Sequence, residues 1–164
     1  MDFLKKTNDP RLSSIAVRYV GAKSELEKIS AKASIDPTVQ IGMPFGFDNS
    51  SINSEVTKSK LASFYDYSQV DRTRMAKTTS PMFLVTAAQT QLLLAEAAQR
   101  GWITGTNAET FFNRGVKLHL EQMALYDANS SVSASAIDAY QKQIHTIQVR
   151  LWTKSIRNIG LPLS

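Results

Sequence analysis

The sequence predicts a mainly α-helical protein with an irregular, loop-rich N-terminal region. After residue 80, apolar residues recur every three or four positions, which is the period of a helix. Before residue 80, the chain is rich in Ser, Asn, Thr and Pro, with short possible elements and long connections. We therefore expect one partial domain over residues 1–164, with a loop-rich region at 1–80 and a helical region at 81–164.

Two short elements are expected near the N-terminus. Ile15, Val17 and Tyr19 alternate with other residues as the inward-facing positions of a β-strand do. Ser24 and Glu27 have the spacing of a capping box, in which each side chain bonds the backbone N–H of the other residue. That spacing predicts a short helix after the strand.

The clearest element in the chain is a helix that begins near Thr86 and ends at Gly101. Thr86 and Gln89 have capping-box spacing. Leucines and alanines fill the middle of the segment, so it combines high helix propensity with the apolar composition of a buried helix. Gly101 takes a left-handed conformation at no steric cost, and Trp102 holds the position of the hydrophobic contact in a Schellman motif.

A second helix is expected from the next capping-box spacing, Thr106 with Glu109, to about Tyr126. Its apolar residues recur at helical spacing: Phe112, Val116, Leu120 and Met123. Together the two helices form a helical hairpin of the size found in tetratricopeptide-like scaffolds. Such hairpins bury an apolar face only by stacking on their neighbours.

A last helix is expected over about Ser135 to Ile159. Its apolar stripe consists of Ile137, Tyr140, Ile144, Ile147 and Leu151. Basic residues lie on its final turns, at Arg150, Lys154 and Arg157. Cations at this end of a helix oppose the helix dipole favourably, so we interpret them as structural rather than as a phosphate site.

Composition and charge exclude several classes of protein. The 164 residues contain no apolar run of the roughly 18 residues that a membrane span requires. The absence of cysteine excludes disulfides, thiolate metal sites and cysteine catalysis. The net charge of +5 is spread over both halves of the sequence, which argues against nucleic acid as a partner.

The sequence shows no catalytic, metal or cofactor site. His119 and His145 fall on different predicted helices, and neither belongs to a metal-binding pattern. No serine has the context of a nucleophile elbow, and no glycine belongs to a phosphate-binding loop. We therefore expect a protein that is not an enzyme and needs no cofactor.

An aromatic cluster in the irregular stretch from residue 36 to residue 67 is the best candidate for a ligand site. It consists of Phe45, Phe47, Phe64, Tyr65 and Tyr67, with Asp48, Asn49, Asp66 and Gln69 as polar neighbours. Rings cover the C–H face of a sugar, while amides and carboxylates bond its hydroxyls. The candidate ligand-binding residues are Phe47, Tyr65, Asp66 and Tyr67.

Within this cluster, Phe45 is the more structural candidate, whereas Tyr65 and Tyr67 lie on one side of the chain if it is extended. The alternative is that these aromatic residues anchor the loops to the helical scaffold. The sequence leaves both interpretations open.

Several short strings occur in a fixed order along the chain. They are NDPR at 8–11, QIGMPFG at 40–46, SP at 80–81, AEA at 95–97 and RGW at 100–102. In this order, and over nearly the whole chain, they resemble the SusD/RagB superfamily of outer-membrane nutrient-binding lipoproteins, specifically its SusD-like branch in Bacteroidetes.

The resemblance implies a scaffold of helical hairpins and a binding role without catalysis. It implies starch, another oligosaccharide or another nutrient as the ligand, and a TonB-dependent SusC-like transporter as the partner at the cell outer membrane. Family members are about three times as long and begin with a signal peptide and a lipidated cysteine, neither of which this sequence contains. We therefore expect an internal to C-terminal portion of such a protein, with apolar faces that favour self-association.

A second function class stays open beside the first. Stacked helical hairpins present extended surfaces to other proteins. On this interpretation, the chain is a helical-repeat module for protein–protein interaction without a small-molecule site.

Overall fold

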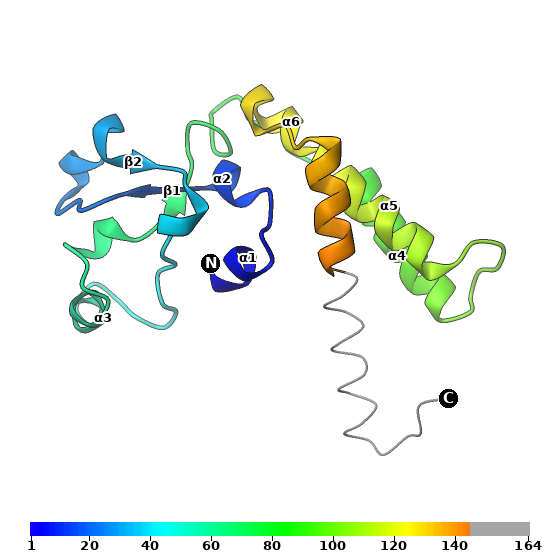
Figure 1. Ribbon diagram of the computed structural model, residues 1–164, viewed down its shortest axis with the longest axis horizontal. Coiled ribbons are helices and arrows are strands. Elements are labelled where there is room, and N and C mark those ends of the chain that lie inside the picture. Colours follow the sequence, from blue (N-terminus) through cyan, green and yellow to red (C-terminus); the bar gives the residue numbers. More distant parts are fainter. Residues whose placement is uncertain (145–164) are drawn as a thin grey trace, which may run out of the picture. The chain divides into compact units, whose positions relative to one another are not determined.

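The computed structural model describes residues 1–144 (Figure 1). The chain forms two compact units. Met1–Pro81 and Leu125–Ser130 form the first, which we call the N-terminal unit. Met82–Ala124 and the described residues from Ser131 onward form the second, which we call the helical unit. The predicted mainly α-helical class is confirmed.

A small antiparallel sheet organises the N-terminal unit. Its strands are β1 (Ala16–Tyr19), β2 (Ala33–Ser34) and β3 (Gln69–Val70), in the order β2-β1-β3. Tyr19 pairs with Ala33, and Val17 pairs with Gln69. The strand predicted from alternation is therefore confirmed as β1, which is the central strand of the sheet.

Short helices precede and connect the strands. They are the α-helices α1 (Asp2–Lys6), α2 (Leu12–Ile15) and α3 (Ile52–Lys58), and the 3-10 helices η1 (Glu25–Glu27), η2 (Ser30–Lys32), η3 (Pro37–Val39) and η4 (Phe64–Asp66). The short helix expected after Ser24 is η1, but the Ser24 side chain does not cap it. Instead, the Glu27 carboxylate accepts a hydrogen bond of 3.2 Å from the Lys23 backbone N–H.

Helix α3 lies within the stretch that we expected to be irregular. Its start is organised by Asp48, whose carboxylate accepts hydrogen bonds of 2.7–3.0 Å from the backbone and hydroxyl groups of Ser50 and Ser51. These bonds, led by the Ser51 hydroxyl, hold the pKa of Asp48 well below its usual range. The helix then buries Ile52 and Val56 against Tyr67, which explains why it forms among loop residues.

The predicted helical hairpin is confirmed in the helical unit. Helices α4 (Ala87–Gln99) and α5 (Ala108–Glu121) pack side by side (Figure 1). The shorter elements α6 (Met123–Tyr126) and η5 (Ala128–Ser130) follow, and residues 134–144 are helical, as expected for the described part of the last helix. None of the helices within residues 1–144 is long and apolar enough to cross a membrane.

Both ends of α4 have the predicted geometry. The Gln89 N–H donates to Thr86 Oγ1 at 3.1 Å, and the Thr86 N–H donates to Gln89 Oε1 at 3.0 Å, which completes the capping box. Gly101 has a φ of +71°, and the Trp102 N–H donates to the Ala97 carbonyl at 2.9 Å, as a Schellman motif requires. The Trp102 ring, however, is 71% exposed and contacts the Arg100 guanidinium at 5.1 Å.

Two expectations about the hairpin are wrong. The N-cap of α5 is Asn107, whose side chain accepts from the Thr110 N–H at 2.8 Å, so the helix starts one residue later than the Thr106 spacing suggested. Asparagine is among the strongest N-cap residues, which accounts for the shift. The second wrong expectation is that α4 is a buried helix. Among residues 1–144 it packs mainly against α5, on one side, so Leu93 is 66% exposed.

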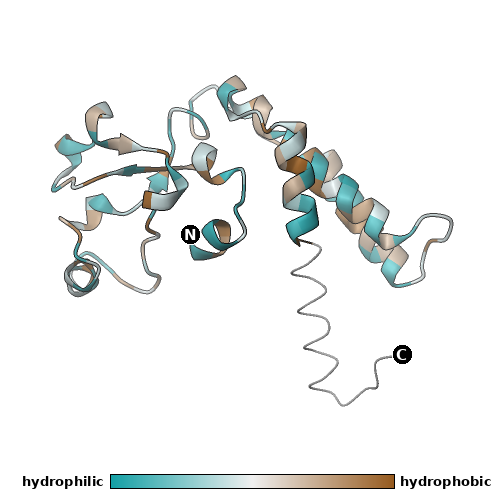
Figure 2. Ribbon diagram, viewed as in Figure 1, coloured by the Kyte–Doolittle hydropathy of each residue, from teal (hydrophilic) through white to brown (hydrophobic). Residues whose placement is uncertain are grey.

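The core of the helical unit lies between α5 and the helix at residues 134–144. Leu120, Ile137 and Tyr140 are buried there. Val116, Val132 and Ile144 pack against them at its border. Figure 2 shows hydrophobic residues on the helix at residues 134–144. The predicted positions Ile147, Leu151, Arg150, Lys154 and Arg157 lie outside the described residues.

Helices α4 and α5 approach closely at Gly115. A Cβ atom at this position would lie 2.9 Å from two side-chain carbons of Leu92 and 3.3 Å from the Ala88 carbonyl oxygen. The glycine is therefore required by the contact between the helices, although it lowers the helix propensity of α5.

Replacing Gly115 with Ala should destabilise the hairpin. The overpacking costs about 1–3 kcal/mol, which outweighs a gain of about 1 kcal/mol in helix propensity. We expect a lower midpoint of urea unfolding, measured by far-ultraviolet circular dichroism. Arg114→Ala, at the exposed neighbouring position, should leave the midpoint nearly unchanged, and adding Leu92→Ala to Gly115→Ala should recover part of the loss. An unchanged or raised midpoint for Gly115→Ala alone would contradict the close packing.

Candidate functional site

Asp66 lies at the centre of a buried polar network in the N-terminal unit. Its carboxylate pairs with the Arg18 guanidinium at 3.0 Å and accepts from the backbone N–H groups of Gly21 at 2.9 Å and Ala62 at 3.1 Å. Arg18 also donates to the Val39 carbonyl at 2.7 Å. Asp66 is 3% exposed. In the structure, this predicted ligand-binding residue therefore bonds other groups of the protein and is almost inaccessible to solvent.

Tyr67 is also inside the protein, in the apolar cluster with Ile52 and Val56. It is 2% exposed, and its hydroxyl has no hydrogen-bond partner among residues 1–144. Phe47 is half-buried and packs against the same cluster. These placements match the alternative in which aromatic residues anchor the loops.

Tyr65 lies elsewhere. The expectation that Tyr65 and Tyr67 share one side of an extended chain is wrong, because the 3-10 helix η4 turns the chain between them. Tyr65 is half-buried, its ring lies 4.1 Å from the Phe64 ring between centroids, and the Lys28 ammonium lies 5.9 Å from its centroid. Phe45, expected to be structural, is fully exposed. A ligand-binding role for Phe47, Tyr65, Asp66 and Tyr67 stays a prediction.

A small polar pocket lies beside Tyr65. It has a volume of about 160 Å³ and is lined by Tyr19, Glu25, Lys28, Gln69, Val70 and Arg72; we call it the Tyr19 pocket. The β1 and β3 strands contribute Tyr19 and Gln69, which share a face of the sheet because Val17 pairs with Gln69. Glu25 and Lys28 come from η1 and its C-terminal end.

Lys28 connects the Tyr19 pocket to Tyr65. Its ammonium group lies 2.6 Å from the Glu25 carboxylate and donates to Gln69 Oε1 at 3.1 Å. The Lys28 side chain is 11% exposed, whereas that of Glu25 is 59% exposed. The cation is therefore part of the pocket floor, and its carboxylate partner approaches from the solvent side.

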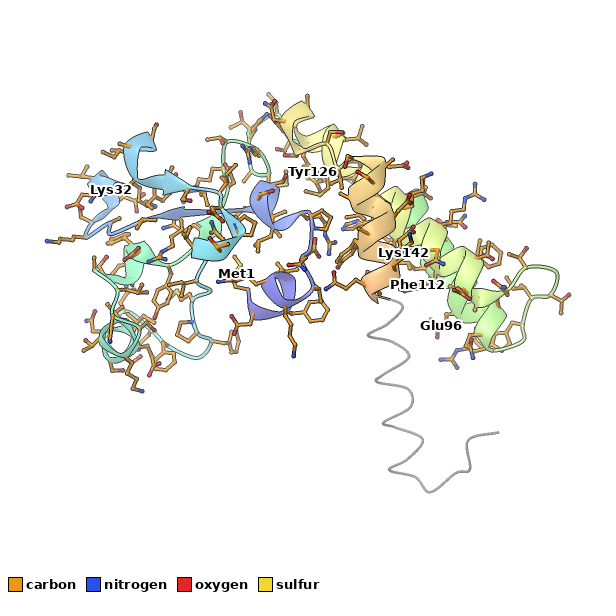
Figure 3. All side chains as sticks on the ribbon, in the orientation of Figure 1. Met1, Lys32, Glu96, Phe112, Tyr126 and Lys142 are labelled. Carbon is orange, nitrogen blue, oxygen red and sulfur yellow. The ribbon has the colours of Figure 1, made fainter. Side chains whose placement is uncertain are left out.

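Neighbouring contacts hold the two edges of the Tyr19 pocket. Lys32, labelled in Figure 3, forms an ion pair with Glu27 and donates to the Gly21 carbonyl at 3.2 Å, which secures the segment that carries Lys28. On the other edge, buried Asp71 accepts from the Thr73 N–H at 2.8 Å and fixes the turn that presents Arg72.

A second pocket, of about 270 Å³, lies by the NDPR string between α1, α2 and η3. Its lining residues are Leu4, Lys5, Asn8, Asp9, Pro10, Leu12, Ser13, Pro37 and Thr38. Its charged groups already contact the protein: Asp9 pairs with Arg11, and Lys5 donates to the carbonyls of Thr38 and Gln40 at 3.0 and 3.1 Å. The Tyr19 pocket differs in that Arg72 has no hydrogen bond or ion pair within residues 1–144, so we take the Tyr19 pocket as the candidate ligand site.

Sequence reasoning named Gln69 and Tyr65 but missed Tyr19, Glu25, Lys28 and Arg72 as site residues. The i, i+3 spacing of Glu25 and Lys28 was a visible signal of an ion pair. Nothing in the sequence indicated that β1 pairs with β3, which is the contact that brings Tyr19 next to Gln69 and Arg72.

Metal-binding arrangements are absent from the described part of the chain: no group of three His, Asp or Glu side chains there could hold a metal ion. His119 is an exposed residue on α5, and His145 lies outside the described residues.

Asp66→Asn should destabilise the N-terminal unit because it leaves the Arg18 guanidinium buried without a counter-charge. Breaking a buried ion pair in this way costs about 3–5 kcal/mol. We expect faster cleavage by a protease within residues 1–81, with the cleavage sites mapped by mass spectrometry. Asp2→Asn, which removes an exposed carboxylate from the same unit, should leave cleavage unchanged; equal resistance of Asp66→Asn would show that the network is not needed.

Comparisons with known proteins agree with this architecture. A family model, SusD-like_2, described as "Starch-binding associating with outer membrane", matches residues 1–161. A solved structure of a chitin-binding protein is 26% identical, with a TM-score of 0.62 over 85% of this chain and 27% of that one. A second structure, from Bacteroides vulgatus and with a suggested role in nutrient binding at the outer membrane, is 24% identical, with a TM-score of 0.62 over 85% of this chain and 28% of that one.

The chain spans just over a quarter of the length of these two solved proteins. No curated protein matches it. Because the family model covers nearly the whole sequence, from its folded N-terminal unit through the helical hairpin, the chain belongs to the SusD-like family.

Proposed function

We propose that this chain is part of a non-catalytic glycan-binding or nutrient-binding protein that acts in uptake at the outer surface of the outer membrane. The family description, starch binding in association with the outer membrane, supports this proposal, as does the chitin-binding label of a solved relative. A TonB-dependent SusC-like transporter is the proposed partner.

The Tyr19 pocket is the observation that carries the proposal within this chain. It combines aromatic and aliphatic surface from Tyr19 and Val70 with polar groups from Gln69, Lys28 and Glu25. Its lining is mostly polar, so hydrogen bonds to sugar hydroxyls are expected to contribute more to binding here than apolar contact does. At about 160 Å³ it is smaller than the roughly 300–1,000 Å³ of typical small-molecule pockets, so it suits one ring of a longer glycan whose remainder lies outside the pocket.

Tyr65 is proposed to support this site through Lys28 and by presenting its half-buried ring beside it. Tyr67 and Asp66 are proposed to act indirectly, by holding η4 in place. This division follows from burial: a group that is 2–3% exposed cannot contact a ligand without a change in the structure.

Tyr19→Ala and Tyr65→Ala should each weaken glycan binding without unfolding the protein. Losing one ring contact with a sugar corresponds to about 1 kcal/mol, or roughly a fivefold rise in Kd by isothermal titration calorimetry. Phe45→Ala is the matched control, because it removes an exposed aromatic ring from the same unit outside the pocket. Unchanged affinity of both tyrosine variants for a glycan that the wild type binds would place the site elsewhere.

A second candidate function is protein–protein contact through the helical unit. Three apolar residues just before α4 favour it, because Met82, Leu84 and Val85 are 77–87% exposed, and Leu93 is exposed on α4 itself. Exposed apolar residues that are close together mark interaction surfaces. On this proposal the helical unit contacts the SusC-like transporter whether or not a glycan is bound.

Leu84→Ser combined with Leu93→Ser should reduce capture of the chain by the SusC-like transporter in detergent, without added glycan. The fold should survive because neither side chain is buried. Leu26→Ser, which changes an exposed leucine of the N-terminal unit, is the matched control. If the control lowers capture while the double variant does not, the contact surface is in the N-terminal unit.

A further inference from the structure

We propose that the Tyr19 pocket selects a sugar that carries a carboxylate, such as a uronic acid, and that Lys28 and Arg72 bind that carboxylate. The side chain of Glu25 occupies the corresponding position on Lys28 in the structure and is displaced by the ligand. This inference rests on the proposed glycan-binding function and adds the class of sugar to it.

The environment of Lys28 favours an anionic ligand. Its side chain is nearly buried, yet the only carboxylate near its ammonium group within residues 1–144 belongs to the solvent-facing Glu25. Gln69 Oε1 and Glu25 take two of the three N–H donors of the ammonium group. The Tyr65 ring, 5.9 Å away, also favours a cation here. A desolvated cation of this kind attracts an anion more strongly than one on the open surface.

Glu25 is held weakly enough for a ligand to displace it. Ion pairs with a solvent-exposed member contribute little to stability, because water solvates the exposed carboxylate and the side chain loses entropy in the pair. Glu25 belongs to a three-residue 3-10 helix and does not cap it. A carboxylate held on a bound sugar can therefore replace Glu25 on Lys28, and Glu25 then turns into solvent.

The charged groups at the rim of the Tyr19 pocket do not balance one another. Arg72 is exposed and has no hydrogen bond or ion pair within residues 1–144. Its planar guanidinium group matches a carboxylate with two parallel hydrogen bonds. The Tyr19 pocket has two positive side chains, Lys28 and Arg72, and one negative side chain, Glu25, so it has an excess positive charge. A neutral sugar forms no ion pair with this charge.

The remaining lining residues explain why the ligand is a sugar acid rather than a simple anion. The Tyr19 ring offers apolar surface to the C–H face of a sugar ring, and Val70 also lines the pocket. Gln69 offers an amide to a hydroxyl group beside that surface. An inorganic anion makes no use of these groups.

The experiment compares tri-galacturonate with its fully methyl-esterified form, which keeps the sugar skeleton and removes the charge. Binding to the full chain is measured by isothermal titration calorimetry at low and high salt. We expect the acid to bind at least tenfold more tightly than the ester, with the difference shrinking at high salt.

Variants of the two lysine–glutamate pairs provide the matched test. Lys28→Met should lower affinity for the acid at least tenfold and leave affinity for the ester unchanged, whereas Glu25→Gln should raise affinity for the acid. Lys58→Met and Glu55→Gln are the controls, because they change a lysine–glutamate pair of the same i, i+3 spacing on α3, outside the pocket. They should alter neither the affinity for the acid nor the affinity for the ester. Arg72→Gln tests the rim through an exposed side chain, so its result stands if Lys28→Met fails to fold.

Two outcomes would overturn the inference in distinguishable ways. If the ester or another neutral glycan binds as tightly as the acid and Tyr65→Ala still weakens that binding, charge selection is wrong while glycan binding stands. If the wild-type chain binds none of these sugars, the inference and the glycan-binding proposal fail together for this portion of the protein.

Discussion

The buried ion pair between Arg18 and Asp66 is the interaction on which the N-terminal unit depends. Its polar atoms reach the central strand, the turn at Gly21, the end of η3 at Val39 and the backbone at Ala62. The unit has only short strands and helices, so few of its contacts come from regular hydrogen-bond ladders. The ion pair compensates for the small number of ladders, because it bonds several backbone groups of different loops. Buried polar groups left unpaired are costly.

The same ion pair positions the candidate site, although neither member lines it. Successive strand residues point to opposite faces, so fixing Arg18 on the Asp66 side directs Tyr19 to the other side, toward Gln69. Asp66 is also the last residue of η4, which carries Tyr65 beside Lys28. The geometry of the pocket therefore depends on a contact between residues separated by 48 positions in the sequence.

The parts of the structure that sequence predicted well are those controlled by neighbouring residues. The capping box of Thr86 and Gln89, the left-handed Gly101 and the alternation in β1 each depend on residues within five positions of one another. Burial of α4 and the placement of Tyr67 depend on what packs against them, which spacing does not reveal. The predicted start of α5 is wrong by one residue, because Thr106 and Asn107 are adjacent and both are acceptable N-cap residues.

The contrast between the two units bears on how such a protein acquires new ligands. Helices α4 and α5 fit each other through close contacts such as that of Gly115 with Leu92, where one added carbon already overlaps. The Tyr19 pocket instead takes two of its three charged groups, Glu25 and Arg72, from exposed positions. Substitutions at Glu25 and Arg72 change the charge of the pocket and should leave the Arg18–Asp66 network intact, because the hydrogen bonds and the ion pair of that network involve neither residue. On the proposed function, ligand chemistry can therefore vary in this unit at little cost to folding.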